Sequence, residues 1–118
     1  MKLLSSTVHG FLDYVVVAAF ALAPTLFGFG GAAATISYVL AGVHLVLTAL
    51  TAFPPGLIKL VPATVHGWIE LVVAICLIAL PFVAGFTGAA RNFYLVAGAV
   101  IFVVWLITNY ETAETSAV

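Results

Sequence analysis

Two short segments carry most of the acid–base side chains of this sequence. VHGFLD and VHGWIE each hold a histidine, a glycine and, four residues after the histidine, a carboxylate. On a helix, residues i and i+4 lie on one face, so we expect His9 to stack over Asp13 and His66 over Glu70. Imidazole and carboxylate groups can form hydrogen-bonded contacts, relay protons or bind a metal ion.

Three interpretations of these four residues remain open. We favour local hydrogen bonds near a helix N-terminus, where the helix dipole stabilises a carboxylate and the pairs can join two helices. The second interpretation is a proton or ion path, because carboxylates and histidines inside membranes are the usual relay groups. The third is a metal or haem site with His9, Asp13, His66 and Glu70 as ligands. The i,i+4 spacing alone signals metal binding only weakly, so we assign no metal, cofactor or catalytic residue.

The composition indicates a membrane protein. Of 118 residues, 65% are hydrophobic and only 6% are charged, whereas soluble domains carry about 25% charged residues. In water such a chain would expose large apolar patches and aggregate, so the lipid bilayer is its expected surrounding. The formal net charge of −1 offers no basic patch for nucleic acid.

Four apolar stretches are long enough to cross a bilayer, which takes about 20 residues of helix. They cover about 8–27, 33–53, 62–84 and 92–110, and short Gly- and Pro-rich segments separate them. Such clusters mark turns and helix ends. The sequence therefore predicts an all-α polytopic membrane protein with four transmembrane helices.

The chain contains an internal duplication. Residues 6–29 align without gaps on residues 63–86, and the second halves follow after a one-residue slip that pairs YVLAG with YLVAG. This predicts two tandem two-helix membrane repeats, 1–57 and 58–118. Because two crossings return the chain to its starting side, the repeats should be parallel, with both His–carboxylate pairs at the same depth.

A third histidine, His44, lies in the middle of the second apolar stretch, and its partner in the repeat alignment is Val100. Because the duplication did not keep it, a symmetric site does not need it. We expect His44 to be hydrogen-bonded inside the helix bundle, with a relay group or an axial haem ligand as alternatives. Its expected position far from His9 argues against a metal shared with the two pairs.

Each repeat has a proline near the end of its first helix, Pro24 or Pro81, and a Gly-Phe turn at the same distance after it. This unit resembles the SPW repeat family, small integral membrane proteins of bacteria and archaea, over nearly the whole chain. The family is named after a Ser-Pro-Trp triplet, of which only the proline is present in the two repeats here. The VHG segments also look like that family. The resemblance implies a four-helix fold in the plasma (inner) membrane of a prokaryote and no catalytic residue.

Few charges are available to set the orientation. Lys2 and Lys59 share one side with both termini, whereas Arg91 lies on the other. Lysine and arginine favour the cytoplasmic side, so we expect both termini in the cytoplasm.

No phosphate-binding loop, nucleophile elbow or cysteine cluster occurs in the sequence. We therefore expect a structural or accessory membrane protein without enzymatic activity or cofactor that self-associates as a homo-oligomer. The alternatives are a small oligomeric proton or ion transporter or channel, and a metal- or haem-binding membrane protein. Small residues at Ala41-Gly42 and Ala97-Gly98 are expected to mark helix crossing points.

Overall fold

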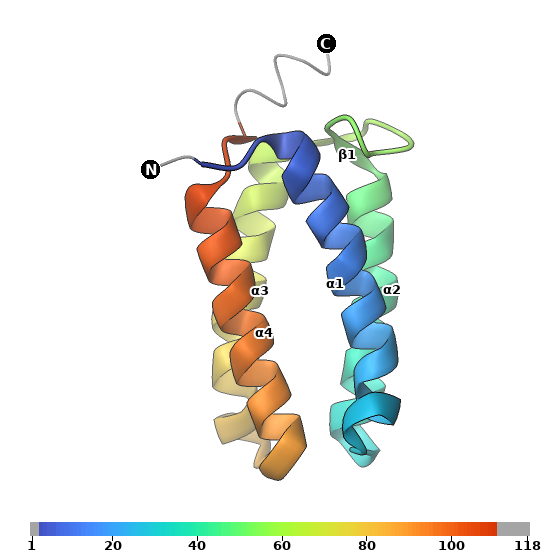
Figure 1. The fold of residues 1–118 in the computed structure, drawn as a ribbon, viewed down its shortest axis with the longest axis vertical. Coiled ribbons are helices and arrows are strands. Elements are labelled where there is room, and N and C mark those ends of the chain that lie inside the picture. Colours follow the sequence, from blue (N-terminus) through green and yellow to red (C-terminus); the bar gives the residue numbers. More distant parts are fainter. Residues whose placement is uncertain (1–2, 111–118) are drawn as a thin grey trace.

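The computed structural model describes residues 3–110, which run up and down through four long helices joined by short connections (Figure 1). The start of α1, the end of α4 and a two-stranded parallel pair lie at the same end of the bundle, at the top of Figure 1. The elements are α1 (Ser6–Phe27), α2 (Gly31–Ala49), β1 (Thr51–Ala52), β2 (Val61–Pro62), α3 (Ala63–Ala84) and α4 (Gly88–Ile107).

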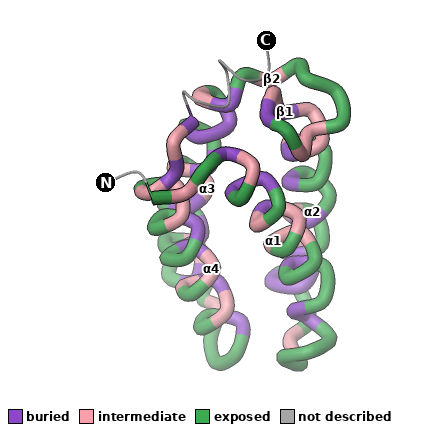
Figure 2. The backbone as a smooth tube through the Cα atoms, turned by 45° about the horizontal axis from the view of Figure 1, so that its top comes forward, coloured by how far each residue is buried: buried purple, intermediate pink, exposed green. Residues whose placement is uncertain are grey.

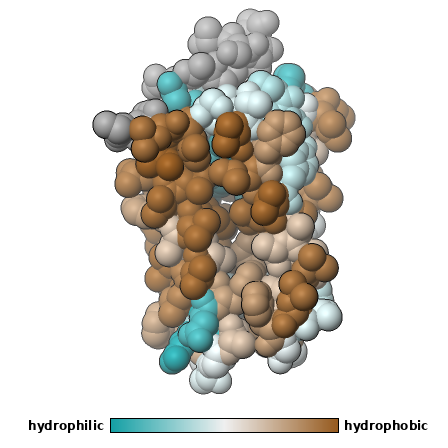
Figure 3. All heavy atoms as spheres, viewed as in Figure 1, coloured by the Kyte–Doolittle hydropathy of each residue, from teal (hydrophilic) through white to brown (hydrophobic). Residues whose placement is uncertain are grey.

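Within the described residues, all four helices are long and apolar enough to cross a membrane, which confirms the predicted fold class. Large apolar side chains cover most of the helical surface seen in Figure 3. Polar side chains are instead buried between the helices. Figure 2 shows where the buried positions lie along each helix. Apolar side chains outside and polar side chains inside are the pattern expected in lipid, because ionisable groups in membranes face the bundle interior. The buried polar set is Ser6, His9, Asp13, Ser37, His44, Thr48, Thr51, His66, Glu70 and Thr108.

The helices form two hairpins. α1 packs closely along α2, and α3 along α4, whereas α1 and α4 touch only sparsely. Away from the strands, Phe20, Leu77 and Tyr94 belong to a shared apolar core. The Tyr94 hydroxyl donates a 2.6 Å hydrogen bond to the Ala33 carbonyl and so joins α4 to α2.

Two predicted helix ends were wrong. The second stretch was expected to reach Phe53, but α2 ends at Ala49. Phe53 precedes a proline, and the residue before proline is disfavoured in the helical region. The chain instead forms β1, which pairs with β2, and the Lys59 ammonium donates to the Phe53 carbonyl at 2.6 Å.

The fourth helix lies a few residues earlier than predicted. It begins at Gly88 and ends at Ile107, against the expected 92–110. Thr108 takes an extended conformation, with φ −92° and ψ 138°, and pairs with Leu4 in a parallel bridge. This pairing ends the helix and places the Thr108 side chain in the bundle.

Equivalent positions of the two hairpins lie 57 residues apart throughout, so the predicted one-residue slip was wrong. The bridge of Thr51 with Val61 is matched by the bridge of Leu4 with Thr108. Buried residues of α2 and α4 match at the same offset, at positions 37 and 94, 41 and 98, and 44 and 101. Such matched contacts are what a duplication predicts, and the division into repeats 1–57 and 58–118 stays a prediction.

Gly98→Ala is expected to lower the free energy of unfolding by about 1–3 kcal/mol, the range for overpacking. A Cβ at this position would lie 2.7 Å from Ile78 Cγ1 and 2.9 Å from the Ala74 carbonyl oxygen. Gly42→Ala is the matched control, because nothing lies within 4 Å of its added Cβ. Thermal unfolding in detergent should separate the two variants, and equal midpoints would contradict Gly98 as a crossing point.

Candidate metal centre

The site is built on the first two turns of α1 and α3, which begin at the same end of the bundle. The Ser5 hydroxyl caps α1 by accepting from the Val8 amide at 3.2 Å, which fixes where the helix starts. The glycine after each histidine lets another segment lie against the helix. A Cβ on Gly10 would lie 2.6 Å from Pro55 Cγ, and one on Gly67 would lie 2.9 Å from the Tyr110 ring.

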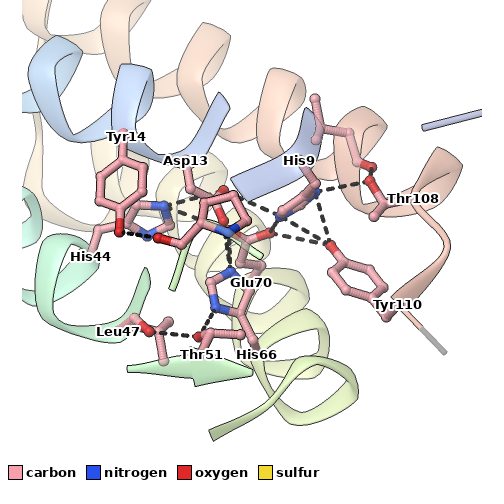
Figure 4. Close-up of polar contacts among 12 residues, drawn as sticks. His9, Asp13, Tyr14, His44, Leu47, Thr51, His66, Glu70, Thr108 and Tyr110 are labelled. Atoms are coloured by element: carbon pink, nitrogen blue, oxygen red, sulfur yellow. Dashed lines mark hydrogen bonds and ion pairs between the residues drawn. The ribbon is translucent and has the colours of Figure 1, made fainter. Parts of the chain in front are cut away.

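The two predicted His–carboxylate pairs meet in one closed ring of contacts (Figure 4). His9 Nε2 lies 3.2 Å from Asp13 Oδ1 and 2.8 Å from Glu70 Oε2. His66 Nε2 lies 3.0 Å from Asp13 Oδ2 and 3.0 Å from Glu70 Oε1. Each carboxylate therefore spans both histidines, and all four residues are at most 3% exposed.

The hydrogen bonds of His9 determine which ring nitrogen carries its proton. Its Nδ1 lies 2.9 Å from Thr108 Oγ1. The single hydroxyl proton of Thr108 is donated to the Val104 carbonyl at 2.6 Å. Thr108 must therefore accept from Nδ1–H, and in the neutral ring Nε2 presents its lone pair to the carboxylates.

His66 is held in the same way from the other hairpin. Its Nδ1 lies 2.7 Å from Thr51 Oγ1, and Thr51 donates its proton to the Leu47 carbonyl at 2.6 Å. Thr51 lies in β1, directly after the α1–α2 hairpin, whereas Thr108 directly follows α4 of the second hairpin. Each hairpin therefore supplies the threonine that orients the other hairpin's histidine. Neither threonine was predicted from the sequence, although the two threonines lie 57 positions apart, as the two histidines do.

His44 lies at the site, which corrects the prediction that it is far from the pairs. Its Nε2 is 3.5 Å from Asp13 Oδ1 and 3.6 Å from Glu70 Oε1. α2 runs back toward the start of α1, so a residue five positions before the end of α2 has the depth of Asp13. His44 is 8% exposed, and among the described residues its Nε2 has no aligned hydrogen-bond partner.

Tyr110 makes the site asymmetric. Its hydroxyl donates to Glu70 Oε2 at 3.3 Å, and its ring meets the His9 ring edge-on with centroids 5.0 Å apart. Burial, together with the nearby Glu70 charge, raises the pKa of Tyr110 above its ordinary value, so the phenol stays a donor. The equivalent residue beside His66 is Phe53, with ring centroids 5.4 Å apart and no hydroxyl.

The spacing of the ring atoms suits a metal ion. Ligands about 2.0–2.1 Å from a metal are about 2.9–3.4 Å from one another in octahedral or tetrahedral geometry. The four ring contacts are 2.8–3.2 Å, and one ligand atom from each residue lies within 4.8 Å of all the others. Asp13 Oδ2 approaches His66 Nε2 without hydrogen-bond alignment and, within residues 3–110, has no hydrogen-bond partner.

The family model of the SPW repeat domain matches residues 7–108. The chain belongs to the SPW repeat family. The matched part of this SPW repeat protein contains all four ring residues and both supporting threonines. No curated protein and no solved structure matches the chain.

Pro24 and Pro81 lie near the ends of α1 and α3 that are remote from the ring. The Pro24 carbonyl accepts from the amides of Gly28 at 3.0 Å and Phe29 at 3.1 Å, and the Pro81 carbonyl accepts from Phe86 at 2.8 Å. Gly28 has φ 71°, the left-handed conformation that ends helices in this motif. The family's proline and Gly-Phe turn therefore end the first helix of each hairpin.

Proposed function

We propose that this SPW repeat protein binds one divalent transition-metal ion inside the membrane, between α1 and α3. The observation that carries the proposal is the ring itself, with both Nδ1–H groups held by threonine hydroxyls. The neutral imidazoles then direct Nε2 lone pairs at carboxylate oxygens 2.8–3.2 Å away. Two lone pairs at this distance repel each other unless a proton or a metal cation is held by both groups, and one metal ion at the centre would satisfy all four side chains together.

Charge and ligand type narrow the class of ion. One divalent ion neutralises the two carboxylates, which are costly to bury unpaired. Two imidazoles and two carboxylates suit Zn²⁺, Fe²⁺ or Mn²⁺, whereas Ca²⁺ and Mg²⁺ prefer all-oxygen sites. Haem is disfavoured, because the cavity beside the ring holds about 120 Å³, below the ~300–1,000 Å³ of pockets for larger ligands.

The test is the metal content of the purified protein. The chain would be produced with an affinity tag that lacks histidine, purified in detergent without chelators and analysed for first-row metals. Equilibrium with micromolar Zn²⁺ should then bring any empty fraction to one ion per chain. A protein that stays metal-free under these conditions contradicts the proposal.

Thr51→Val and Thr108→Val are each expected to weaken Zn²⁺ binding by about 10–100-fold, the usual effect of losing a hydrogen bond to a ligand histidine. Valine keeps the shape of threonine but cannot accept from Nδ1–H. Thr48→Val is the matched control, because the buried Thr48 hydroxyl has no hydrogen-bond partner within the described residues. Competition with a coloured chelator measures the three affinities, and equal affinities would show that the threonines do not orient the ligands.

A proton-binding role is the second candidate, and the position of His44 favours it. If both ring imidazoles are protonated, the same four residues form imidazolium–carboxylate pairs. His44 Nε2 then lies within 3.6 Å of both carboxylates, close enough to exchange a proton with them. Proton flux into liposomes by metal-free protein, lost in Asp13→Asn and Glu70→Gln, would support this candidate over the metal ion.

A metal that joins α1 to α3 also suits the structural or accessory role expected from the sequence, and the homo-oligomer stays a separate proposal. We propose no enzymatic activity. A metal ion inside the bundle would link the two hairpins where α1 and α4 pack sparsely. Light scattering of the detergent-solubilised protein would show whether the chain self-associates.

We propose that the ring lies toward the cytoplasmic side of a prokaryotic plasma membrane. Lys59 lies at the ring end of the bundle and Arg91 at the opposite end. Lys2, the other lysine used to predict the orientation, lies outside the described residues. A reporter active only in the cytoplasm, fused to the C-terminus, should be active, and a periplasmic reporter should not.

A further inference from the structure

A small cavity lies against the carboxylate side of the ring, between α1 and α4, and holds about 120 Å³. Only its inner end is polar, where the two carboxylates lie. Residues around it include Leu12 and Val16 from α1, Val100 and Val104 from α4, and the carboxylates of Asp13 and Glu70.

The mouth of this cavity opens on the lipid-facing surface. Val15 and Val100 line it and are also 62% and 48% exposed on the outside of the bundle. They stand on α1 and α4, the two helices that pack sparsely. Apolar side chains cover the bundle where α1 and α4 face the viewer in Figure 3.

We infer that this cavity admits a small uncharged molecule from the bilayer to the metal site, an inference that rests on the proposed metal binding. An ion would lose its hydration between these apolar walls without compensation. A dry apolar cavity of about 150 Å³ can hold benzene, so the occupant is no larger than about that.

The inner end of the cavity offers a reason for binding. Asp13 and Glu70 line this end, and both are ligands in the proposed metal site. Fe²⁺ and Mn²⁺ accept up to six ligands, so four protein ligands leave them able to take a further one. The molecule that fits is therefore small, soluble in lipid and equipped with one donor atom or weakly polar group.

The test uses nitric oxide as a small uncharged probe of Fe²⁺-loaded protein under anaerobic conditions. Val104→Phe narrows the cavity from a wall that is not part of the ring. Its neighbour Val103→Phe is the matched control, since Val103 is 52% exposed and absent from the lining. Leu12→Phe narrows the cavity from α1 and replaces Val104→Phe in the test if that variant fails to fold.

Wild type and Val103→Phe should both form the iron–nitrosyl signal, and Val104→Phe should keep its iron but bind nitric oxide at least about tenfold more slowly. Azide, a charged probe, should react poorly with all three. Equal nitric oxide rates in iron-loaded Val104→Phe and wild type overturn the lipid route, as does rapid reaction with azide. A wild type that takes up no metal overturns the proposed function and this inference together.

Discussion

His66→Ala should lower the affinity for Zn²⁺ by at least about 100-fold, since losing a ligand exceeds the ~10–100-fold effect of losing its outer hydrogen bond. His66 Nε2 is 3.0 Å from an oxygen of Asp13 and 3.0 Å from one of Glu70, so the ring opens without it. His9 occupies the equivalent position, and His9→Ala should have an effect of similar size. Metal content and chelator competition on detergent-solubilised protein measure both.

His44→Ala is the control for these variants. The ring of four ligand residues is closed without His44, so its loss should change the Zn²⁺ affinity by less than about tenfold. Unchanged helix content and a monodisperse elution would show that His66→Ala is folded, and His66→Gln offers a second variant with a polar side chain. A His66→Ala protein with wild-type affinity for Zn²⁺ would show that the metal does not bind at the ring.

Removing the metal should lower the stability by about 4 kcal/mol, compared with protein in free Zn²⁺ at about 1,000 times the dissociation constant. Without the ion, Asp13 and Glu70 remain buried at 3% and 2% exposure and must share protons with the histidines. Thermal unfolding in detergent, with Zn²⁺ and with a chelator, measures the difference as a lower midpoint in chelator.

The His66→Ala protein is the matched control for metal removal, because it lacks a ligand. After a loss of at least about 100-fold in affinity, the same free Zn²⁺ is at most about 10 times its dissociation constant and should stabilise it by at most about 1.4 kcal/mol, well below the wild-type gain. Wild-type protein that loses its metal but keeps its unfolding midpoint would contradict a metal that joins α1 to α3. A shift of equal size in wild type and His66→Ala would instead indicate Zn²⁺ bound outside the ring.

The overall fold could be predicted because its causes are local in the sequence. Composition indicates the bilayer, and Gly and Pro clusters separate the helices. The boundary at Phe53 was wrong because the strand pairing of Thr51 depends on Val61, ten residues later, and no hydropathy pattern shows such a bond. The i,i+4 spacing correctly placed His9 and Asp13 on one face.

The assembled site could be predicted only in part. Helical spacing shows which residues share a face but not how far each helix turns toward its neighbours. Thr108 contacts His9 across 99 positions, and the slip assumed in the alignment hid the common offset of 57 that relates it to Thr51. His44 was misplaced because its position in the middle of the second apolar stretch was taken as a depth far from His9, whereas α2 ends at Ala49 and brings it to the ring.

The exchange of Asp13 for Glu70 between the hairpins does not argue against a metal. The two side chains differ in length by one methylene. In the structure, both carboxylates reach both histidines, with one oxygen directed at each ring. The longer Glu70 side chain also accepts from Tyr110, a donor that the other hairpin replaces with Phe53.

X-ray diffraction at a metal absorption edge, from crystals of protein purified without chelators, tests the metal centre most directly. We predict one anomalous peak within about 2.0–2.3 Å of His9 Nε2, His66 Nε2 and one oxygen each of Asp13 and Glu70. The absence of a peak after soaking in Zn²⁺, with both imidazoles hydrogen-bonded directly to the carboxylates, would contradict the metal centre.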